Sequence, residues 1–314
     1  MDGLPETLKP IVATSPQRTL KASIGCVGTG LHSGRRVSLT LRPAAAGTGI
    51  VFRRTDLGID IPARFDRVTD TRLCTMLAAG TDQAACVGTV EHLMAALFGA
   101  GIDNAVVDVD GPELPVLDGS AAPYVFLIDC AGVVEQAAPR AVIEVLRTVR
   151  VAGDNAFAEL RPASFGLHLS LSIDFSAAAI GRQAFSLHLT ERSFREELAQ
   201  ARTFTQLHEI EALQSSGRAL GGSLRNAVVV DGGRVLNPEG LRMEQEFVRH
   251  KMLDAVGDLA LAGAALQGRF MAHRSGHALN NRLLHALFAD AANWRYAAAE
   301  PVSRSGFGFA RAAA

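Results

Sequence analysis

Hydrophobic and polar residues alternate in short runs through the first part of the chain. Glycine and proline separate these runs, and this pattern predicts antiparallel strands joined by turns. The runs are residues 21–27, 36–41 and 48–53. After Thr89, which is predicted to cap a helix, residues 90–98 follow a helical pattern that glycines end, and residues 104–109 are predicted as a strand. The first half is therefore predicted as strands followed by a helix.

The second half repeats this plan. Its predicted strands are residues 141–151, 156–160, 166–173, 226–230 and 269–272, and its predicted helices are residues 245–264 and 278–289. Residues 136–140 are the expected boundary between the halves. We therefore predict an α+β fold with two domains of similar topology, residues 18–138 and 139–314, preceded by a loose extension over residues 1–17.

Three polar residues lie four positions apart in the predicted helix at residues 245–264. His250, Asp254 and Asp258 drift by only about 40° per step around a helix, so they would point into the same cleft. A surface histidine–aspartate pair has the same spacing and contributes only a few tenths of a kcal/mol. The apolar neighbours favour burial, where carboxylates need partners such as a metal cation. These neighbours are Phe247, Val248, Met252, Leu253, Val256, Leu259 and Leu261.

Glu91 and His92 open the predicted helix of the first half. Small residues share the face of His92 and leave room for a ligand, although this helix alone favours a capping glutamate beside an ordinary histidine. Together, His92, His250 and Asp254 would make a three-ligand zinc site with the fourth position open, as in catalytic zinc sites. Glu91 would then act on the water bound there. The same ligand set also suits Fe(II).

His277 follows a predicted strand and precedes a predicted helix, a position from which an imidazole can enter a cleft. It is a candidate general acid, and Asp258 is placed to orient it and to favour its protonated form. A helix cap and a surface charge are the alternative for this pair. His32, in a glycine-flanked turn, is a further candidate for lining the same cleft.

Composition limits the classes of function. With 31 basic and 32 acidic residues among 314, the chain has no electrostatic footprint for a nucleic acid, so no such partner is predicted. No apolar run is long enough to span a bilayer and the N-terminus has no signal-peptide core, so we predict a cytoplasmic protein without a transmembrane segment. Four cysteines without a C-x-x-C pair predict neither a disulfide framework nor a thiolate zinc site.

Seven motifs carry a resemblance to a known family. They are TGLHSG at residues 29–34, GIVFRR at 49–54, TVEHL at 89–93, PVLDGS at 115–120, ARTF at 201–204, HKMLDAVGD at 250–258 and SGHALNN at 275–281. In this order, the motifs resemble UDP-3-O-acyl-N-acetylglucosamine deacetylase, the zinc amidase that commits lipid A biosynthesis. The match runs from about residue 18 to beyond residue 294.

The resemblance implies a role for each matching residue. Zinc would be bound by His92, His250 and Asp254. Glu91 would be the general base and His277 the general acid, supported by Asp258, with Thr203 as the oxyanion donor. The implied substrate contacts are Phe204 and Lys251 for the sugar and its phosphates, and Gly222 and Ser223 in the passage for a fatty acyl chain.

The implied fold is two domains, each a mainly antiparallel sheet packed on two helices, with the active site between them. The implied reaction hydrolyses the N-acetyl group of UDP-3-O-acyl-N-acetylglucosamine to acetate and a free amine, in a monomer that uses Zn²⁺ or, at the same site, Fe²⁺. Residues 1–17 and 176–190 do not match clearly, so the acyl-chain length preference is open. A zinc peptidase is disfavoured because H-E-x-x-H is absent. The non-enzyme alternative is a binding module in which a metal only staples two domains.

Overall fold

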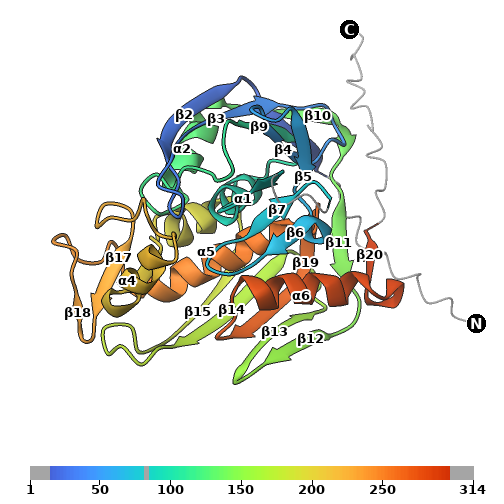
Figure 1. Cartoon of the computed structure of the whole chain (residues 1–314). Coiled ribbons are helices and arrows are strands. Elements are labelled where there is room, and N and C mark those ends of the chain that lie inside the picture. Colours follow the sequence, from blue (N-terminus) through green and yellow to red (C-terminus); the bar gives the residue numbers. More distant parts are fainter. Residues whose placement is uncertain (1–14, 81–84, 298–314) are drawn as a thin grey trace, which may run out of the picture.

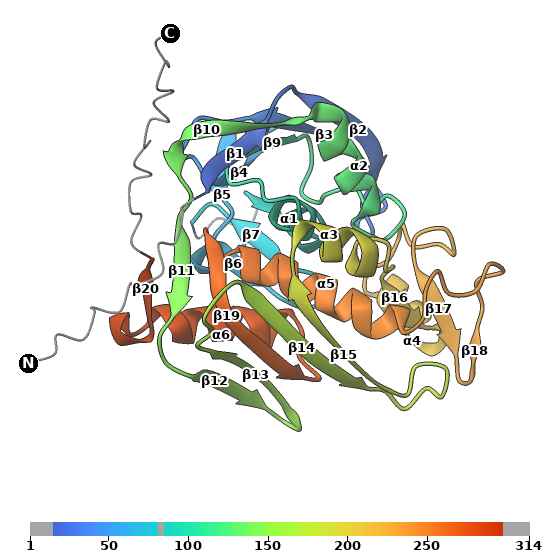
Figure 2. The ribbon, with the colours of Figure 1, turned by 180° about the vertical axis from the view of Figure 1, so that it is seen from behind.

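The computed structural model describes residues 15–80 and 85–297. Helices α1 (Glu91–Gly99) and α5 (Glu246–Ala260) pack together in the middle of the molecule, between the sheets of the first and second parts of the chain (Figure 1). The view from behind shows the same arrangement (Figure 2). The predicted α+β class is confirmed, and the domain boundary at residue 138 stays a prediction.

The first part of the chain forms a five-stranded sheet in the order β2-β3-β9-β4-β5. Neighbours are antiparallel except β4 and β9, which run parallel. In β3, Val37, Leu39 and Leu41 are buried and alternate with more exposed residues, so one face of the sheet packs on the core. The strands are β2 (Ile24–Thr29), β3 (Arg36–Pro43), β4 (Ile50–Arg54), β5 (Ile59–Pro62) and β9 (Ala105–Val109).

Two small sheets and helix α2 (Ala122–Ala131) complete the first part. The sheets are β1 (Pro16–Leu20) with β10 (Val133–Pro139), and β6 (Val68–Asp70), β7 (Met76–Ala78) and β8 (Cys86–Val87) after the 3₁₀ turn η1 (Phe65–Arg67). Helix α2 was not predicted, because its sequence is almost continuously apolar and has no helical period. Residues 16 and 17 of the predicted loose extension belong to β1, and residues 1–14 lie outside the described residues.

The second part forms a seven-stranded sheet around β19. The single strand predicted over residues 141–151 is wrong, because β11 pairs with β19 and β20 whereas β12 pairs with β13, so the chain leaves the sheet between them. The strands are β11 (Val142–Val145), β12 (Val149–Gly153), β13 (Ala156–Arg161), β14 (Leu167–Asp174), β15 (Arg182–Leu189), β19 (Ala265–His273) and β20 (Trp294–Tyr296).

The predicted helices at residues 245–264 and 278–289 are confirmed as α5 and α6 (His277–Phe288), although α5 ends at Ala260. The unassigned region before them contains a small three-stranded sheet and helix α4, which has no buried residues. These elements are α3 (Glu191–Ser193), the π-helical turn Phe194–Leu198, β16 (Phe204–Gln206), α4 (Leu207–Ser215), β17 (Val228–Asp231) and β18 (Arg234–Val235); the 3₁₀ turn η3 (Ala291–Asn293) follows α6.

Helices α1 and α5 touch through their backbones at Gly257. A Cβ atom at this position would lie 2.0 Å from the carbonyl oxygen of Glu91, a distance that real Cβ atoms do not adopt. Glycine therefore lets the two helices approach more closely than any other residue would allow. This contact fixes the polar start of α1 against the polar stripe of α5.

Among residues 15–80 and 85–297, none of the helices combines the length and the apolar character needed to cross a membrane.

Candidate active site

The predicted polar stripe of α5 is present and faces the interior. His250, Asp254 and Asp258 are all buried, in a helix whose other residues are almost all buried apolar side chains. The surface-pair alternative for this spacing is therefore excluded. The stripe begins one turn earlier than the sequence suggested, because Glu246 is also buried and lies four residues before His250.

His92, His250 and Asp254 converge on one point. Their ligand atoms all lie within 4.8 Å of one another, and Oδ1 of Asp254 is 3.5 Å from Nε2 of His92 and 3.3 Å from Nε2 of His250. Two ligands of a tetrahedral zinc ion with bond lengths near 2.0 to 2.1 Å lie about 3.3 Å apart. Oδ1 of Asp254 is buried and has no hydrogen-bond partner within the described residues. The three residues thus fit a divalent cation.

Neighbouring groups fix the orientation of two of these residues. Nδ1 of His250 is 3.0 Å from the carbonyl oxygen of Ala201, so this nitrogen carries the proton and Nε2 keeps a free lone pair. The Nζ of Lys251 donates to Oδ2 of Asp254 at 2.8 Å and leaves Oδ1 directed at the imidazoles. Burial lowers the pKa of His250 to about 4, so this residue is neutral, as a metal ligand must be.

The start of α1 is held in a strained conformation. The predicted helix cap at Thr89 is wrong: the cap position is Val90, without a side-chain cap bond, and Thr89 has a φ of 56°, which is rare for a β-branched residue. The Thr89 hydroxyl instead donates to Oε1 of Glu113 at 3.1 Å. This geometry turns Glu91 and His92 into the interior, where both are buried.

Glu91 lies next to the converging ligands. Its Oε2 accepts a hydrogen bond of 3.0 Å from the backbone N–H of Thr75. Burial raises the pKa of Glu91 above its usual range, and the neighbouring charges of His277 and His92 oppose that rise. Burial also lowers the pKa of His92, but the nearby carboxylates of Asp254 and Glu91 outweigh it, so its pKa is raised.

Asp258 and His277 form a hydrogen-bonded pair beside Glu91. Nδ1 of His277 is 2.9 Å from Oδ2 of Asp258, and both residues are buried. Burial would lower the pKa of His277, but the charge of Asp258 and the bond to it prevail and raise this pKa to about 9. Asp258 is held in turn by the Thr75 hydroxyl at 2.6 Å and the Asn280 amide at 2.8 Å. The surface-charge alternative for Asp258 is therefore excluded.

Two cavities meet at this cluster. One, of about 480 Å³, is lined by the predicted residues Glu91, His92, Thr203, Phe204, His250, Lys251, Asp254 and His277. The other, of about 800 Å³ and mainly apolar, is lined by Thr203, Phe204, Gly222 and Ser223. Thr203 and Phe204 belong to both walls. The structure thus brings the predicted site residues to the two cavities, with Asp258 directly behind His277.

His32 lines the apolar cavity and not the one that holds the converging ligands. Both of its ring nitrogens are buried without a partner in the described part of the chain, and burial lowers its pKa. Its backbone N–H donates to Oε1 of Glu113 at 2.8 Å. One carboxylate therefore ties the turn containing His32 to Thr89.

Sequence reasoning missed several residues around the site. Thr75 and Glu113 contact Glu91, Asp258 and His32 from other elements of the fold, and no local pattern marked them. Asn280 lies one turn after His277 within the motif SGHALNN, but no role was predicted for it. Arg274 lines the smaller cavity and forms no ion pair within the described residues. The position of this arginine directly before Ser275-Gly276-His277 was the signal that the sequence offered for it.

Comparisons with known proteins agree with this geometry. The sequence model of the UDP-3-O-acyl N-acetylglycosamine deacetylase family matches residues 17–289. The chain is 49% identical over 288 residues to a UDP-3-O-acyl-N-acetylglucosamine deacetylase of Actinobacillus succinogenes, covering 90% of this chain and 93% of the relative. It is 46% identical to one of Actinobacillus pleuropneumoniae (93% and 96% covered) and 48% identical to one of Haemophilus influenzae (89% and 92% covered).

These matches identify the chain as an enzyme of the hydrolase class that acts on an amide. The chain belongs to the UDP-3-O-acyl N-acetylglycosamine deacetylase family. The resemblance inferred from the seven sequence motifs is therefore confirmed.

Proposed function

We propose that the protein hydrolyses the N-acetyl group of UDP-3-O-acyl-N-acetylglucosamine to acetate and the free amine, with a divalent zinc ion as cofactor. This reaction is the committed step of lipid A biosynthesis in the family that the chain belongs to. The observation that carries the proposal is the buried, unpartnered Oδ1 of Asp254 facing two imidazole nitrogens, with Glu91 and His277 in the same cavity. Fe²⁺ is the alternative ion, because the same donor set suits it.

The donor set fits the proposed cofactor. Two neutral imidazoles and one carboxylate are a typical three-ligand set for zinc sites that keep a fourth position open. Zinc bound by His92, His250 and Asp254 would supply Lewis acidity to the amide carbonyl and to the attacking water. The remaining steps rest on the side chains of this chain.

Glu91 is the proposed general base. It is buried beside the ligands, and its pKa is raised by that burial, which moves it toward the value of an efficient base near neutral pH. Its bond from the Thr75 backbone occupies Oε2 and orients the carboxylate. Glu91 would take the proton of the water as it attacks the carbonyl carbon.

His277 is the proposed general acid. With a pKa of about 9 it is protonated at neutral pH and can donate its Nε2 proton to the leaving nitrogen. Asp258 accepts from Nδ1 and stabilises the charged form, so Asp258 is a positioning residue rather than a proton donor. One cavity thus holds a proposed base and a proposed acid, each with a raised pKa. Amide hydrolysis needs such a pair, in which the base is deprotonated and the acid is protonated.

The walls of the two cavities match the other parts of the proposed substrate. Thr203 is the proposed oxyanion donor, and Phe204 and Lys251 are proposed contacts of the sugar and its phosphates, joined by the free guanidinium of Arg274. The apolar cavity of about 800 Å³, with Gly222 and Ser223 in its wall, would hold the fatty acyl chain. A monomeric state and a cytoplasmic location complete the proposal as predictions.

The test is acetate release from UDP-3-O-acyl-N-acetylglucosamine by purified protein. We expect release to stop after chelation and to return with one equivalent of Zn²⁺, and loading with Fe²⁺ under anaerobic conditions compares the two ions. The staple alternative predicts instead that chelation lowers the melting temperature while no acetate is released before or after it. A peptidase would cleave peptide amides and leave the acetyl group in place.

A further inference from the structure

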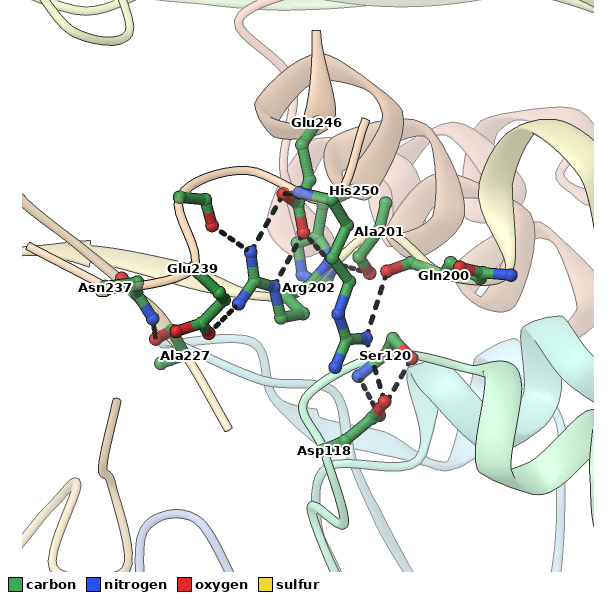
Figure 3. Close-up of polar contacts among 12 residues, drawn as sticks. Asp118, Ser120, Gln200, Ala201, Arg202, Ala227, Asn237, Glu239, Glu246 and His250 are labelled. Atoms are coloured by element: carbon green, nitrogen blue, oxygen red, sulfur yellow. Dashed lines mark hydrogen bonds and ion pairs between the residues drawn. The ribbon is translucent and has the colours of Figure 1, made fainter. Parts of the chain in front are cut away.

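A buried ion pair lies directly behind the candidate metal ligands. Arg202 is 1% exposed and Glu246, in the first turn of α5, is 0% exposed. Nε of Arg202 donates to Oε1 of Glu246 at 2.8 Å and Nη2 to Oε2 at 3.2 Å, and the backbone N–H of Arg202 donates to Oε1 at 3.0 Å (Figure 3). Glu246 therefore holds both the side chain and the main chain of Arg202.

Both terminal nitrogens of Arg202 make further hydrogen bonds. Nη1 donates to Glu239 at 2.7 Å, and Nη2 donates to the carbonyl oxygen of Gly240 at 2.8 Å. Glu246 accepts a further bond from the backbone N–H of Arg242 at 2.7 Å. The guanidinium thus has few alternative orientations, and the backbone at residue 202 is fixed relative to α5.

The residues on either side of Arg202 each contact the candidate site. The carbonyl oxygen of Ala201 is the group that lies 3.0 Å from Nδ1 of His250 (Figure 3). The N–H of Thr203 donates to the carbonyl oxygen of Gly119 at 2.8 Å, and Thr203 lines both cavities. Any shift of residue 202 would therefore move the acceptor for His250 and the proposed oxyanion donor together.

Stability alone does not explain a buried ion pair at this place. Removing two charges from water is expensive, and well-packed apolar residues of similar volume often stabilise a fold as well or better. Arginine also provides a rigid, two-pronged contact that lysine cannot reproduce. What the pair supplies here is a fixed geometry, because Glu246 and His250 lie one helical turn apart and both bind the segment 201–203.

We propose that Arg202 and Glu246 are a positioning pair for the metal site and for Thr203. The pair holds the Ala201 carbonyl against Nδ1 of His250, so that Nε2 stays directed at the cation, and it keeps Thr203 at the wall of the cavity. This inference rests on the proposed function, since it concerns the same metal site. Neither residue touches the substrate or the cation in this scheme.

The test compares Glu246→Gln with Glu239→Gln, its matched control. Glu239 also binds Arg202, but its side chain is 54% exposed and lies at the far side of the guanidinium. The dissociation constant for Zn²⁺ is measured by competition with a chromophoric chelator, and kcat and KM are measured for acetate release. Because outer partners of metal-bound histidines typically change affinity about 10- to 100-fold, Glu246→Gln should weaken Zn²⁺ binding to that extent.

For kcat we expect a loss of about 10-fold or more at saturating Zn²⁺, with KM changed less than about twofold, because Thr203 acts on the transition state. Glu239→Gln should match the wild type in all three quantities. If Glu246→Gln binds Zn²⁺ and turns over like Glu239→Gln, the proposal is wrong. If Glu246→Gln does not fold, Arg202→Lys is measured in the same way, and wild-type values for this variant would also overturn the proposal.

Measurements on fully folded protein distinguish a positioning role of Arg202 and Glu246 from a role in stability alone. Both constants are measured well below the melting temperature, where the variants are fully folded, and a structural role predicts wild-type values there. The proposed function is tested separately by the wild type itself. If the wild type neither binds Zn²⁺ nor releases acetate, the proposed function is wrong. If the wild type is active and Glu246→Gln behaves like it, only the proposal of a positioning pair is wrong.

Discussion

Helices α1 and α5 supply the candidate site in different ways. Helix α1 contributes two consecutive residues, Glu91 and His92, from its first turn, and it is placed by a strained residue before it and by the contact at Gly257. Helix α5 contributes residues at every fourth position, Glu246 to Asp258, along one stripe. The first arrangement depends on tertiary contacts, and the second follows from helical geometry alone.

This difference between the helices bears on metal binding and on proton transfer separately. The α5 stripe would fix the position of the proposed cation and of the proposed acid through His250, Asp254 and Asp258. The start of α1 places one further candidate ligand and the proposed base. Changes in α1 should therefore affect proton transfer without removing the metal, provided His92 is left intact.

The largest effect is expected for Glu91→Gln. Loss of a general base typically lowers turnover about 100- to 10,000-fold, and Zn²⁺ should remain bound because Glu91 is not a ligand. Metal content by atomic emission and kcat for acetate release are measured on the same sample. A variant that loses its zinc along with its activity would mean that α1 supplies two ligands and no base.

The second effect is expected for His277→Ala. A general acid works in its protonated form, so kcat/KM of the wild type should fall as the pH rises through the pKa of about 9 of His277 in the free enzyme. In the variant this basic limb should disappear while the acidic limb remains, and the rate at neutral pH should fall about 100-fold or more. The pH profile is measured at full zinc occupancy. A variant with an unchanged basic limb would exclude His277 as the acid.

A smaller effect is expected where the two helices touch. Gly257→Ala places a methyl group 2.0 Å from the carbonyl oxygen of Glu91, so the backbones must separate. We expect the free energy of unfolding to fall by about 1 to 3 kcal/mol, as for other overpacked sites, and kcat to fall more than Zn²⁺ affinity. Urea unfolding, the acetate assay and metal competition measure these three quantities. Equal losses of metal affinity and kcat would show that the helices cannot be perturbed separately.

The smallest effect is expected at the start of α5. Gln245 has a φ of 55°, is exposed, and makes no side-chain hydrogen bond within the described residues, in contrast to Thr89 before α1. Gln245→Gly should relieve strain and raise the free energy of unfolding by up to about 1 kcal/mol, with kcat unchanged. Thermal unfolding and the acetate assay check both parts. A clear loss of kcat would mean that α5 also depends on a special start.

The same contrast explains what the sequence could predict. The i, i+4 stripe of α5 is a local pattern, so His250, Asp254 and Asp258 could be found from spacing and apolar neighbours. His92 and Glu91 are adjacent residues without a period, so their own helix favoured a capping glutamate beside an ordinary histidine, and only the pairing with the α5 stripe suggested a metal site. Partners such as Thr75, which is 183 residues from Asp258 in the sequence, have no local signal.

The fold follows the same rule. Strands with clear alternation, such as β3, were found within a few residues, and so were α5 and α6. Helix α2 is almost continuously apolar, so it lacks the one-sided pattern that marks a helix. Helix α4 does have apolar residues on one side, Leu207, Ile210 and Leu213, but they line the apolar cavity and none of them is buried. The split between β11 and β12 depends on which strand each one pairs with, and pairing is not visible in a single sequence.

Thr75 joins the two proton-transfer groups through one residue. Its backbone N–H binds Glu91 and its hydroxyl binds Asp258, which in turn binds His277. The proposed base and the proposed acid are therefore held by the same residue. A displacement of Thr75 would change the surroundings, and with them the pKa, of both groups. Thr75→Val would remove only the hydrogen bond from the hydroxyl to Asp258, whereas Thr75→Ser would keep both hydrogen bonds. A substrate that displaced Thr75 on binding would therefore alter Glu91 as the proton acceptor and His277 as the proton donor at the same time.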